Sequence, residues 1–221
     1  MARLTIEHDP VDDGAAKPRR RRSVALRLDG EGWLRVEPEA LAELSLTDGD
    51  EIDDARRAEL EAALTGVRAR RFVVRSLAVR MQSTAELQRK LAARGIPAEV
   101  TGAAIEQAAG YGYIDDAALA EQLARGMRSR GYGRRRAEEK LRTRGLRGPL
   151  AAAALAEAFE GHDEPALARE ALGRRPVATD ADRRRALSFL ARRGFSPTAA
   201  RAAVRGAAAE QPPGAGEARE R

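Results

Sequence analysis

Side chains able to do acid–base or metal chemistry are few and scattered along this chain. His8 and His162 are the only histidines among its 221 residues, and cysteine is absent. One histidine lies in the N-terminal segment and the other in an expected loop, so neither a histidine-ligated metal site nor a catalytic triad has its parts. The adjacent carboxylates of Asp115 and Asp116 are more simply caps for the helix that follows, with a metal or acid–base role as the alternative. We predict no catalytic residue, no metal site and no cofactor.

Cationic side chains are the chemistry that the sequence does concentrate. Residues 125–145 hold nine basic and two acidic residues, and Arg134, Arg135 and Arg136 are expected at the start of a helix. Positive charges there oppose the helix dipole, so their presence indicates a function. Such groups can bind phosphates or an acidic protein surface, and Tyr132 could stack on a base or pack at an interface. The alternative is that these arginines only solvate helix faces. The predicted binding residues are Arg125, Arg128, Arg130, Tyr132, Arg134, Arg135, Arg136, Lys140, Arg183, Arg184 and Arg185.

Composition and charge narrow the class of protein. Apolar residues make up 43% of the chain but aromatic residues only 4%, so alanine and leucine must fill the interior, which suits closely packed helices. The net charge is +6; residues 23–70 carry six basic and twelve acidic residues, whereas 117–160 and 161–209 each carry ten basic and five acidic. This asymmetry predicts a polyanion or an acidic protein as partner. Because no long apolar run or signal-peptide core is present, we predict a soluble, cytoplasmic protein without membrane contact.

One short phrase recurs about every fifty residues. Its anchors Leu91, Leu141 and Leu190 are 50 and 49 residues apart, and each is followed by an arginine, a glycine and an apolar residue. A period of this length indicates stacked supersecondary units. Apolar residues also match eighteen positions before and fourteen positions after each anchor: Val73, Leu123 and Leu172, then Ile105, Leu155 and Val204.

Each repeat is predicted to form three short helices. Ser83 and Glu86 form a capping box at the start of a helix. Gly95 ends that helix in the left-handed conformation, with Arg94 in the last turn where the helix dipole favours a cation. Pro97 then opens a third helix. We interpret the Leu-x-x-Arg-Gly-apolar phrase as a helix-termination signal and not as an active site. The helix N-caps expected at the corresponding position of the three repeats are Ser83, Gly133 and Asp182.

The N-terminal part has a different pattern. The stretch SVALRLDGEGWLRVEP alternates apolar residues around a glycine-rich turn, which predicts a β-hairpin. A short helix over PEALAEL and a helix ended by Gly66 are expected to follow it. Tails rich in proline, glycine and charge are expected to be disordered. The predicted segments are a disordered basic tail (1–22), an acidic hairpin-and-helix extension (23–65), three repeats (66–116, 117–162 and 163–209) and a disordered tail (210–221).

The repeats resemble a known family, RecX, the bacterial regulators of the RecA recombinase. The family's central signature, a Gly-[Leu/Tyr]-[Ile/Leu]-Asp-Asp run followed by a basic loop and Leu-x-x-[Lys/Arg]-Gly, is matched at 112–146 by GYIDDAALAEQLARGMRSRGYGRRRAEEKLRTRGL. Its first-repeat phrase is matched at 83–96 by STAELQRKLAARGI. Leu119 stands where the family usually has an aromatic residue, which affects core packing. The likeness extends over roughly residues 66–209, and the N-terminal hairpin resembles an extension found in many members.

This resemblance implies both a fold and a role. The expected fold is mainly α, with three tandem three-helix repeats in an elongated, curved stack preceded by a small β-hairpin and helix extension. The implied role is to bind in the groove of RecA–DNA filaments and to inhibit ATP hydrolysis, strand exchange and co-protease activity, in control of recombination, DNA repair and the SOS response. The expected partners are the RecA filament and single-stranded DNA, with double-stranded DNA as a further candidate. We expect the chain to be a monomer.

Two other functions fit the same residues. A basic helical protein could bind DNA in general, and a helical stack could act as a scaffold for another protein. Sequence-specific readout is disfavoured, because the side chains that read adenine are scarce near the arginines. The glutamines Gln82, Gln88, Gln107 and Gln122 all lie outside the arginine clusters.

Overall fold

The computed structural model describes residues 1–8 and 23–210. The chain divides into two units, one made of Met1–Ala78 and Lys90–Gly110, the other of Val79–Arg89 and everything from Tyr111 onward. The first unit holds all the strands of the described residues, and the second is helical. The division passes through helix α3, Thr84–Ala92, which links the two.

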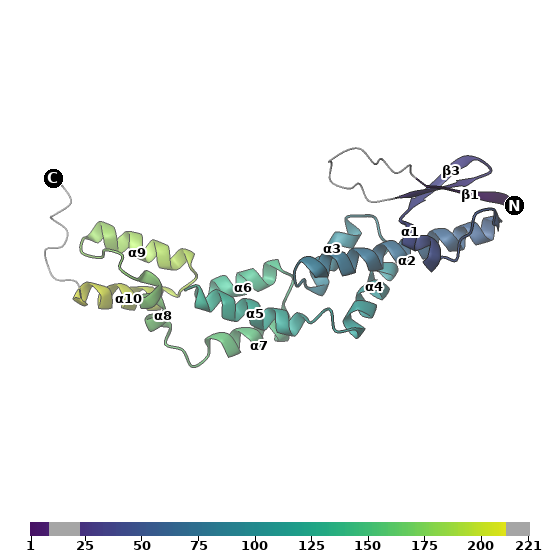
Figure 1. Cartoon of the computed structure of the whole chain (residues 1–221). Coiled ribbons are helices and arrows are strands. Elements are labelled where there is room, and N and C mark those ends of the chain that lie inside the picture. Colours follow the sequence, from purple (N-terminus) through teal and green to yellow (C-terminus); the bar gives the residue numbers. More distant parts are fainter. Residues whose placement is uncertain (9–22, 211–221) are drawn as a thin grey trace, which may run out of the picture. The chain divides into compact units, whose positions relative to one another are not determined.

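A four-stranded antiparallel sheet forms the N-terminal part (Figure 1). Its strands are β1 (Ala2–His8), β2 (Val24–Leu28), β3 (Glu31–Val36) and β4 (Glu51–Ile52), in the order β3-β2-β1-β4. The predicted hairpin is confirmed as β2 and β3, and its turn places Asp29 and Gly30 at φ of 50° and 84°, as a two-residue hairpin turn requires.

Strand β1 corrects the expectation that residues 1–22 are disordered. Leu4 and Ile6 alternate along β1 and pair with Leu28 and Leu26 of β2. Leu4 is buried, so this short alternating run gains an apolar face that composition alone does not reveal. Residues 9–22, the remainder of the predicted basic tail, and residues 211–221 of the predicted C-terminal tail lie outside the described residues.

Two helices pack against this sheet. The predicted short helix is confirmed as α1 (Pro38–Glu43), and α2 (Asp54–Val79) follows. The expectation that Gly66 ends a helix is wrong, because α2 runs through it for 26 residues and the predicted boundary at 65 falls inside α2. Leu60, Leu64 and Val67 continue the apolar stripe at helical spacing and pack in the core of the sheet, so burial outweighs the weak helix propensity of one glycine.

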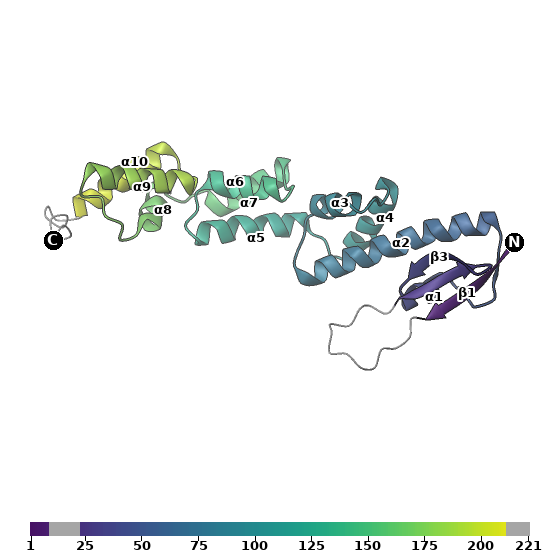
Figure 2. The same ribbon diagram turned by 90° about the horizontal axis from the view of Figure 1, so that it is seen from above.

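The predicted repeats of three helices are confirmed. After α2, the first repeat continues with α3 and α4 (Ala98–Gly110). The second holds α5 (Asp116–Ser129), α6 (Arg134–Thr143) and α7 (Gly148–Phe159), with α6 and α7 lying along α5 (Figure 2). The third holds α8 (Glu164–Leu172), α9 (Asp180–Arg192) and α10 (Pro197–Glu210). The anchors Leu91, Leu141 and Leu190 are at most 1% exposed, so each marks the centre of a helix interface.

Most of the predicted helix ends are confirmed as well. Ser83 and Glu86 form the capping box of α3, with Ser83 Oγ accepting from the Glu86 N–H and Glu86 Oε2 accepting from the Ser83 N–H. Asp182 is not the N-cap of α9. Thr179 caps that helix and Asp182 occupies the third helical position of the same capping box, so α9 starts a turn earlier than predicted.

Candidate functional site

Helix α6 presents cations at its start, as predicted. Gly133 is its N-cap, Arg134 is its first residue, and no acidic residue lies in the first turn. Arg134 and Arg135 are exposed, and neither forms an ion pair or side-chain hydrogen bond within residues 1–8 and 23–210. These two guanidinium groups are therefore available to a partner.

Arg125 and Arg128 are directed toward α7 instead. Arg125 pairs with Glu157 of α7 at 2.8 Å. Arg128 is half-buried and donates to the backbone carbonyl of Ala158 at 2.9 Å, and its guanidinium also contacts the His162 ring. Both arginines, predicted as binding residues, thus have partners within the second repeat.

A hollow of about 420 Å³ lies beside α6 and gathers the remaining predicted residues of this repeat. Its cationic lining is Arg130, Arg136 and Lys140, while Glu139 is its one acidic side chain and pairs with Arg136 at 2.5 Å. Tyr132 also lines the hollow and is half-buried. The structure therefore brings these residues together around one concave surface with an excess of positive charge.

The arginine triplet of the third repeat lies differently from the triplet of α6. Because α9 begins at Asp180, Arg183 and its two neighbours lie inside the helix and not at its first residues. Arg183 donates to the Val177 carbonyl at 3.1 Å, and Arg185 lies 3.3 Å from Asp182. Arg184 is exposed and has no ion pair or side-chain hydrogen bond in the described part of the chain.

The carboxylate pair before α5 serves the fold. Asp115 caps α5, its Oδ1 accepting from the Ala118 N–H at 2.9 Å, which confirms the capping prediction. Asp116 Oδ1 accepts from the Thr84 N–H at 2.9 Å and so ties α5 to the start of α3. No group of three potential metal-ligating side chains occurs in the described ranges.

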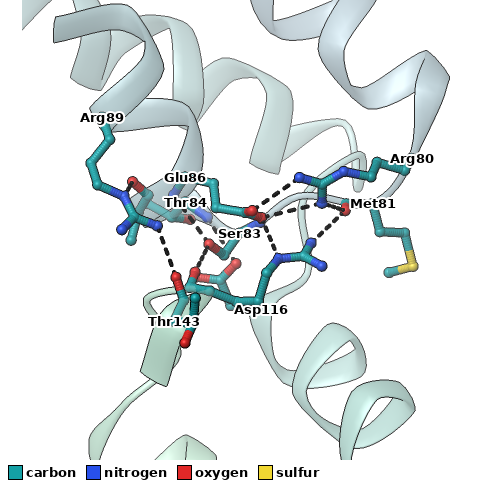
Figure 3. Close-up of polar contacts among 10 residues, drawn as sticks. Arg80, Met81, Ser83, Thr84, Glu86, Arg89, Asp116 and Thr143 are labelled. Carbon is teal, nitrogen blue, oxygen red and sulfur yellow. Dashed lines mark hydrogen bonds and ion pairs between the residues drawn. The ribbon is translucent and has the colours of Figure 1, made fainter. Parts of the chain in front are cut away.

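The start of α3 also contacts the end of α6, and we call this contact the α3–α6 joint (Figure 3). Its central residue is Glu86, whose side chain is 10% exposed. Arg80 donates to Glu86 Oε1 at 3.0 Å, and Arg144 Nε lies 2.7 Å from Oε2. Arg144 also donates to the Met81 carbonyl at 2.9 Å, and Ser83 Oγ donates to the Arg144 carbonyl. One carboxylate is thus held between two arginines.

The charge of Glu86 is stabilised in this joint. Burial raises the pKa of its carboxyl group, but hydrogen bonds from Arg80 and the Ser83 N–H, with the nearby Arg144, lower that pKa more. The net result is a pKa below the ordinary value of 4.5, so Glu86 is ionised at neutral pH and offsets one of the two arginine charges of the joint.

The start of α6 contacts the end of α9 in the same way, and we call this contact the α6–α9 joint. Arg193 donates to the carbonyls of Arg130 and Gly131 at 2.8 and 3.0 Å, while the Gly133 N–H donates to the Arg193 carbonyl at 2.9 Å. The Arg193 guanidinium lies over the ring of Tyr132, 4.9 Å from its centroid. One face of Tyr132 is therefore covered, which limits the predicted stacking on a base to the other face.

These joints were missed by sequence reasoning, which interpreted Arg144 and Arg193 only as residues of a helix end. Both do stand at a helix C-cap. The signal that was missed is the repeat period itself. It matches polar residues that precede the anchor leucines, such as Arg80 and Arg130, as well as the apolar residues of the core. Two exposed tyrosines were missed as well: Tyr111 and Tyr113, 66% and 61% exposed, lie with ring centroids 5.9 Å apart in the turn before α5.

Comparison with known proteins agrees with this architecture. Residues 69–107 match the family model of the first three-helix domain of RecX, and residues 115–155 match that of its second three-helix domain. The regulatory protein RecX of Xanthomonas campestris pv. campestris strain B100 is 39% identical over 156 residues, which are 66% of this chain and 96% of that protein. This chain belongs to the RecX family. The RecX protein of Stenotrophomonas maltophilia strain R551-3 is 37% identical over 164 residues, 72% of this chain and 97% of that protein.

A solved RecX structure supports the fold in particular. The crystal structure of a regulatory protein RecX superposes with a TM-score of 0.55, covering 90% of this chain and 97% of the other at 21% identity. That structure supports the fold, and the matched family models and relatives confirm the resemblance seen in the sequence: the chain is a RecX-type regulatory protein. Within the described residues, no helix combines the length and the apolar character needed to cross a bilayer.

Proposed function

We propose that this RecX-type chain is a non-enzymatic regulator that binds RecA filaments on DNA and inhibits their ATP hydrolysis, strand exchange and co-protease activity. It acts in the cytoplasm as a monomer, in control of recombination, DNA repair and the SOS response. The observation that carries this proposal is the pair of exposed, unpartnered arginines, Arg134 and Arg135, at the start of α6. A RecA–DNA filament offers the phosphates and acidic side chains that such cations bind.

The direct test is the ATPase rate of preformed RecA filaments on single-stranded DNA, with this protein titrated in at moderate salt. We expect inhibition well below one chain per recombinase subunit. No inhibition up to stoichiometric excess would contradict the proposal and would favour the second candidate, a general DNA-binding protein. That candidate predicts equal affinity for bare DNA and filaments and a steep dependence on salt.

A pair of charge-reversal variants tests the surface itself. Arg134→Glu with Arg135→Glu should keep the helical content and weaken inhibition at least tenfold. Arg201→Glu with Arg205→Glu changes the net charge equally at two exposed positions of α10 and should cost much less. Equal losses in the two well-folded variants would show that total charge, and not the α6 surface, determines binding.

A further inference from the structure

The α3–α6 and α6–α9 joints are built from corresponding residues of successive repeats. Each has an arginine before the second helix, a residue in the first turn of that helix, and an arginine at the C-cap of the next repeat's second helix. In the first joint the residue between the two arginines is a glutamate, and in the second it is a third arginine. The corresponding residues are Arg80, Glu86 and Arg144 in the α3–α6 joint, and Arg130, Arg136 and Arg193 in the α6–α9 joint.

The two joints share one backbone contact, but Arg193 has partners that Arg144 lacks: the Arg130 carbonyl and the rings of Tyr132 and Phe189. Arg144 donates to the Met81 carbonyl, and Arg193 donates to the Gly131 carbonyl at the corresponding position. No carboxylate pairs with Arg193 in the described part of the chain. Glu86 offsets one of the two arginine charges in the first joint, whereas the second joint has a third arginine, Arg136, at the corresponding position.

A hollow beside α6 shares Arg130 and Arg136 with this joint, and its lining comes from the second repeat alone. The hollow of about 420 Å³ beside α6 is lined by Arg130, Arg136 and Lys140, against the single carboxylate of Glu139. Glu139 is itself half-exposed and lies on the same helix as its partner Arg136, so it does not bridge the two repeats as Glu86 does. Thr143 adds a polar side chain to the lining.

We infer that the hollow beside α6, which shares Arg130 and Arg136 with the α6–α9 joint, is an oxyanion site, and that its ligand is a phosphate of a polynucleotide backbone. The polynucleotide identity rests on the proposed function, in which DNA is a partner, whereas the anion site rests on the cationic lining of the hollow and on the comparison of the two joints. The bound phosphate contacts Arg130 and Arg136, which correspond to Arg80 and Glu86 of the first joint.

The shape of the site favours a nucleotide phosphate over an acidic side chain. A volume of about 420 Å³ is in the range of small-molecule sites and far exceeds one carboxylate. The half-buried ring of Tyr132 in the lining offers contact to a sugar or base next to the phosphate. Lys140 adds a point charge that suits phosphate.

The anion site is tested by thermal melting in sodium pyrophosphate against sodium chloride at equal ionic strength. At a pyrophosphate concentration about 100 times the dissociation constant, the wild-type Tm should rise by roughly 5 °C. Arg136→Glu places a carboxylate where the α3–α6 joint has Glu86, and should abolish this rise. Arg142→Glu changes the charge equally at an exposed position of α6 outside the hollow and should keep the rise. Equal melting of the wild type in both salts, or loss of the rise in both variants, would overturn the inference.

The nature of the ligand is tested by fluorescence anisotropy with a labelled oligothymidylate and a labelled polyglutamate peptide. Arg136→Glu should weaken oligothymidylate binding at least tenfold, and Arg142→Glu no more than threefold. Tighter binding of polyglutamate than of oligothymidylate at equal salt would overturn the polynucleotide assignment. This result is separable from the proposed function: wild-type protein that binds pyrophosphate but does not slow the filament ATPase contradicts only the function, whereas inhibition without pyrophosphate binding contradicts only the site.

Discussion

The α3–α6 and α6–α9 joints share a backbone arrangement but differ in charge. In both, a C-cap arginine reaches the carbonyls before the preceding repeat's second helix, and the glycine after it lies against that helix. The first joint has Glu86 between its arginines and the second has Arg136. The repeats preserve the contact between a C-cap arginine and a backbone carbonyl, while the side chain at the position of Glu86 or Arg136 determines how much positive charge the joint carries.

The largest expected loss of stability comes from substituting the glycines that lie against the neighbouring helix in each joint. Gly194 has φ of 87°, and a Cβ there would lie 2.4 Å from the backbone nitrogen of Arg136. Gly194→Ala should therefore lower the free energy of unfolding by about 3 kcal/mol or more, measured by urea denaturation, because backbone strain and overpacking add. Gly95→Ala is the control, since Gly95 has φ of 72° but open space around it, and should cost about 1 kcal/mol.

In the α3–α6 joint the corresponding glycine is Gly145, and the clash that a side chain there would cause can be relieved by a second substitution. A Cβ on Gly145 would lie 2.4 Å from the Cβ of Ala85. Gly145→Val should destabilise the second repeat by about 2 kcal/mol or more, and Gly145→Ala somewhat less. Combining Gly145→Ala with Ala85→Gly should recover part of the loss, with a coupling energy of about 1 kcal/mol in a double-mutant cycle. Strictly additive effects would mean that the two residues do not meet.

The next effect concerns the central carboxylate. Glu86→Gln leaves Arg80 and Arg144 without their anion and should cost about 1–3 kcal/mol in urea denaturation. Glu139→Gln removes the exposed carboxylate at the other joint and should cost no more than about 0.5 kcal/mol. Equal costs would refute the view that only the first joint depends on an internal carboxylate.

A smaller effect is the dependence of stability on pH. Because the pKa of Glu86 is lower in the folded chain than its ordinary value of 4.5, its contribution is fully present above pH 4.5 and is lost as the pH falls through the lower folded pKa. The wild type should thus lose more stability than Glu86→Gln between pH 5 and pH 3, to be measured by urea denaturation at each pH. Parallel curves for the two proteins would contradict the assigned role of Glu86.

Much of the fold was predictable because it follows from short-range rules. The capping box of Ser83 and Glu86, the left-handed glycines and the anchor leucines are each specified by a few neighbouring residues. Strand β1 was not predictable from its own seven residues, because its burial depends on pairing with β2, which lies beyond residues 9–22 in the sequence. The prediction that a helix ends at Gly66 failed for the same reason, because the tertiary packing of α2 outweighs the low helix propensity of one glycine.

The residues of the candidate site were predictable from the sequence, but the partner that each of them contacts was not. Charge clustering identified Arg134 and Arg136 together, yet only the fold shows that Arg136 pairs with Glu139 and lines the hollow whereas Arg134 does neither. Arg128 belongs to the same sequence cluster but donates to a backbone carbonyl of α7. Helical periodicity indicates which side a residue faces, whereas its partner is set by which helix packs there, and that information is long-range.

The most direct test of the central comparison is whether the anion response can be moved from one joint to the other. The measurement is the difference in Tm between pyrophosphate and chloride at equal ionic strength. It is made on three proteins: the single variant Arg136→Glu, the double variant Arg136→Glu with Glu86→Arg, and the double variant Arg136→Glu with Glu106→Arg. The last restores the net charge at an exposed position of α4, outside both joints. If the central residue sets the charge of each joint, Glu86→Arg should restore a rise of several degrees and Glu106→Arg should not. A folded Arg136→Glu, Glu86→Arg double variant that melts at the same temperature in both salts would contradict the account.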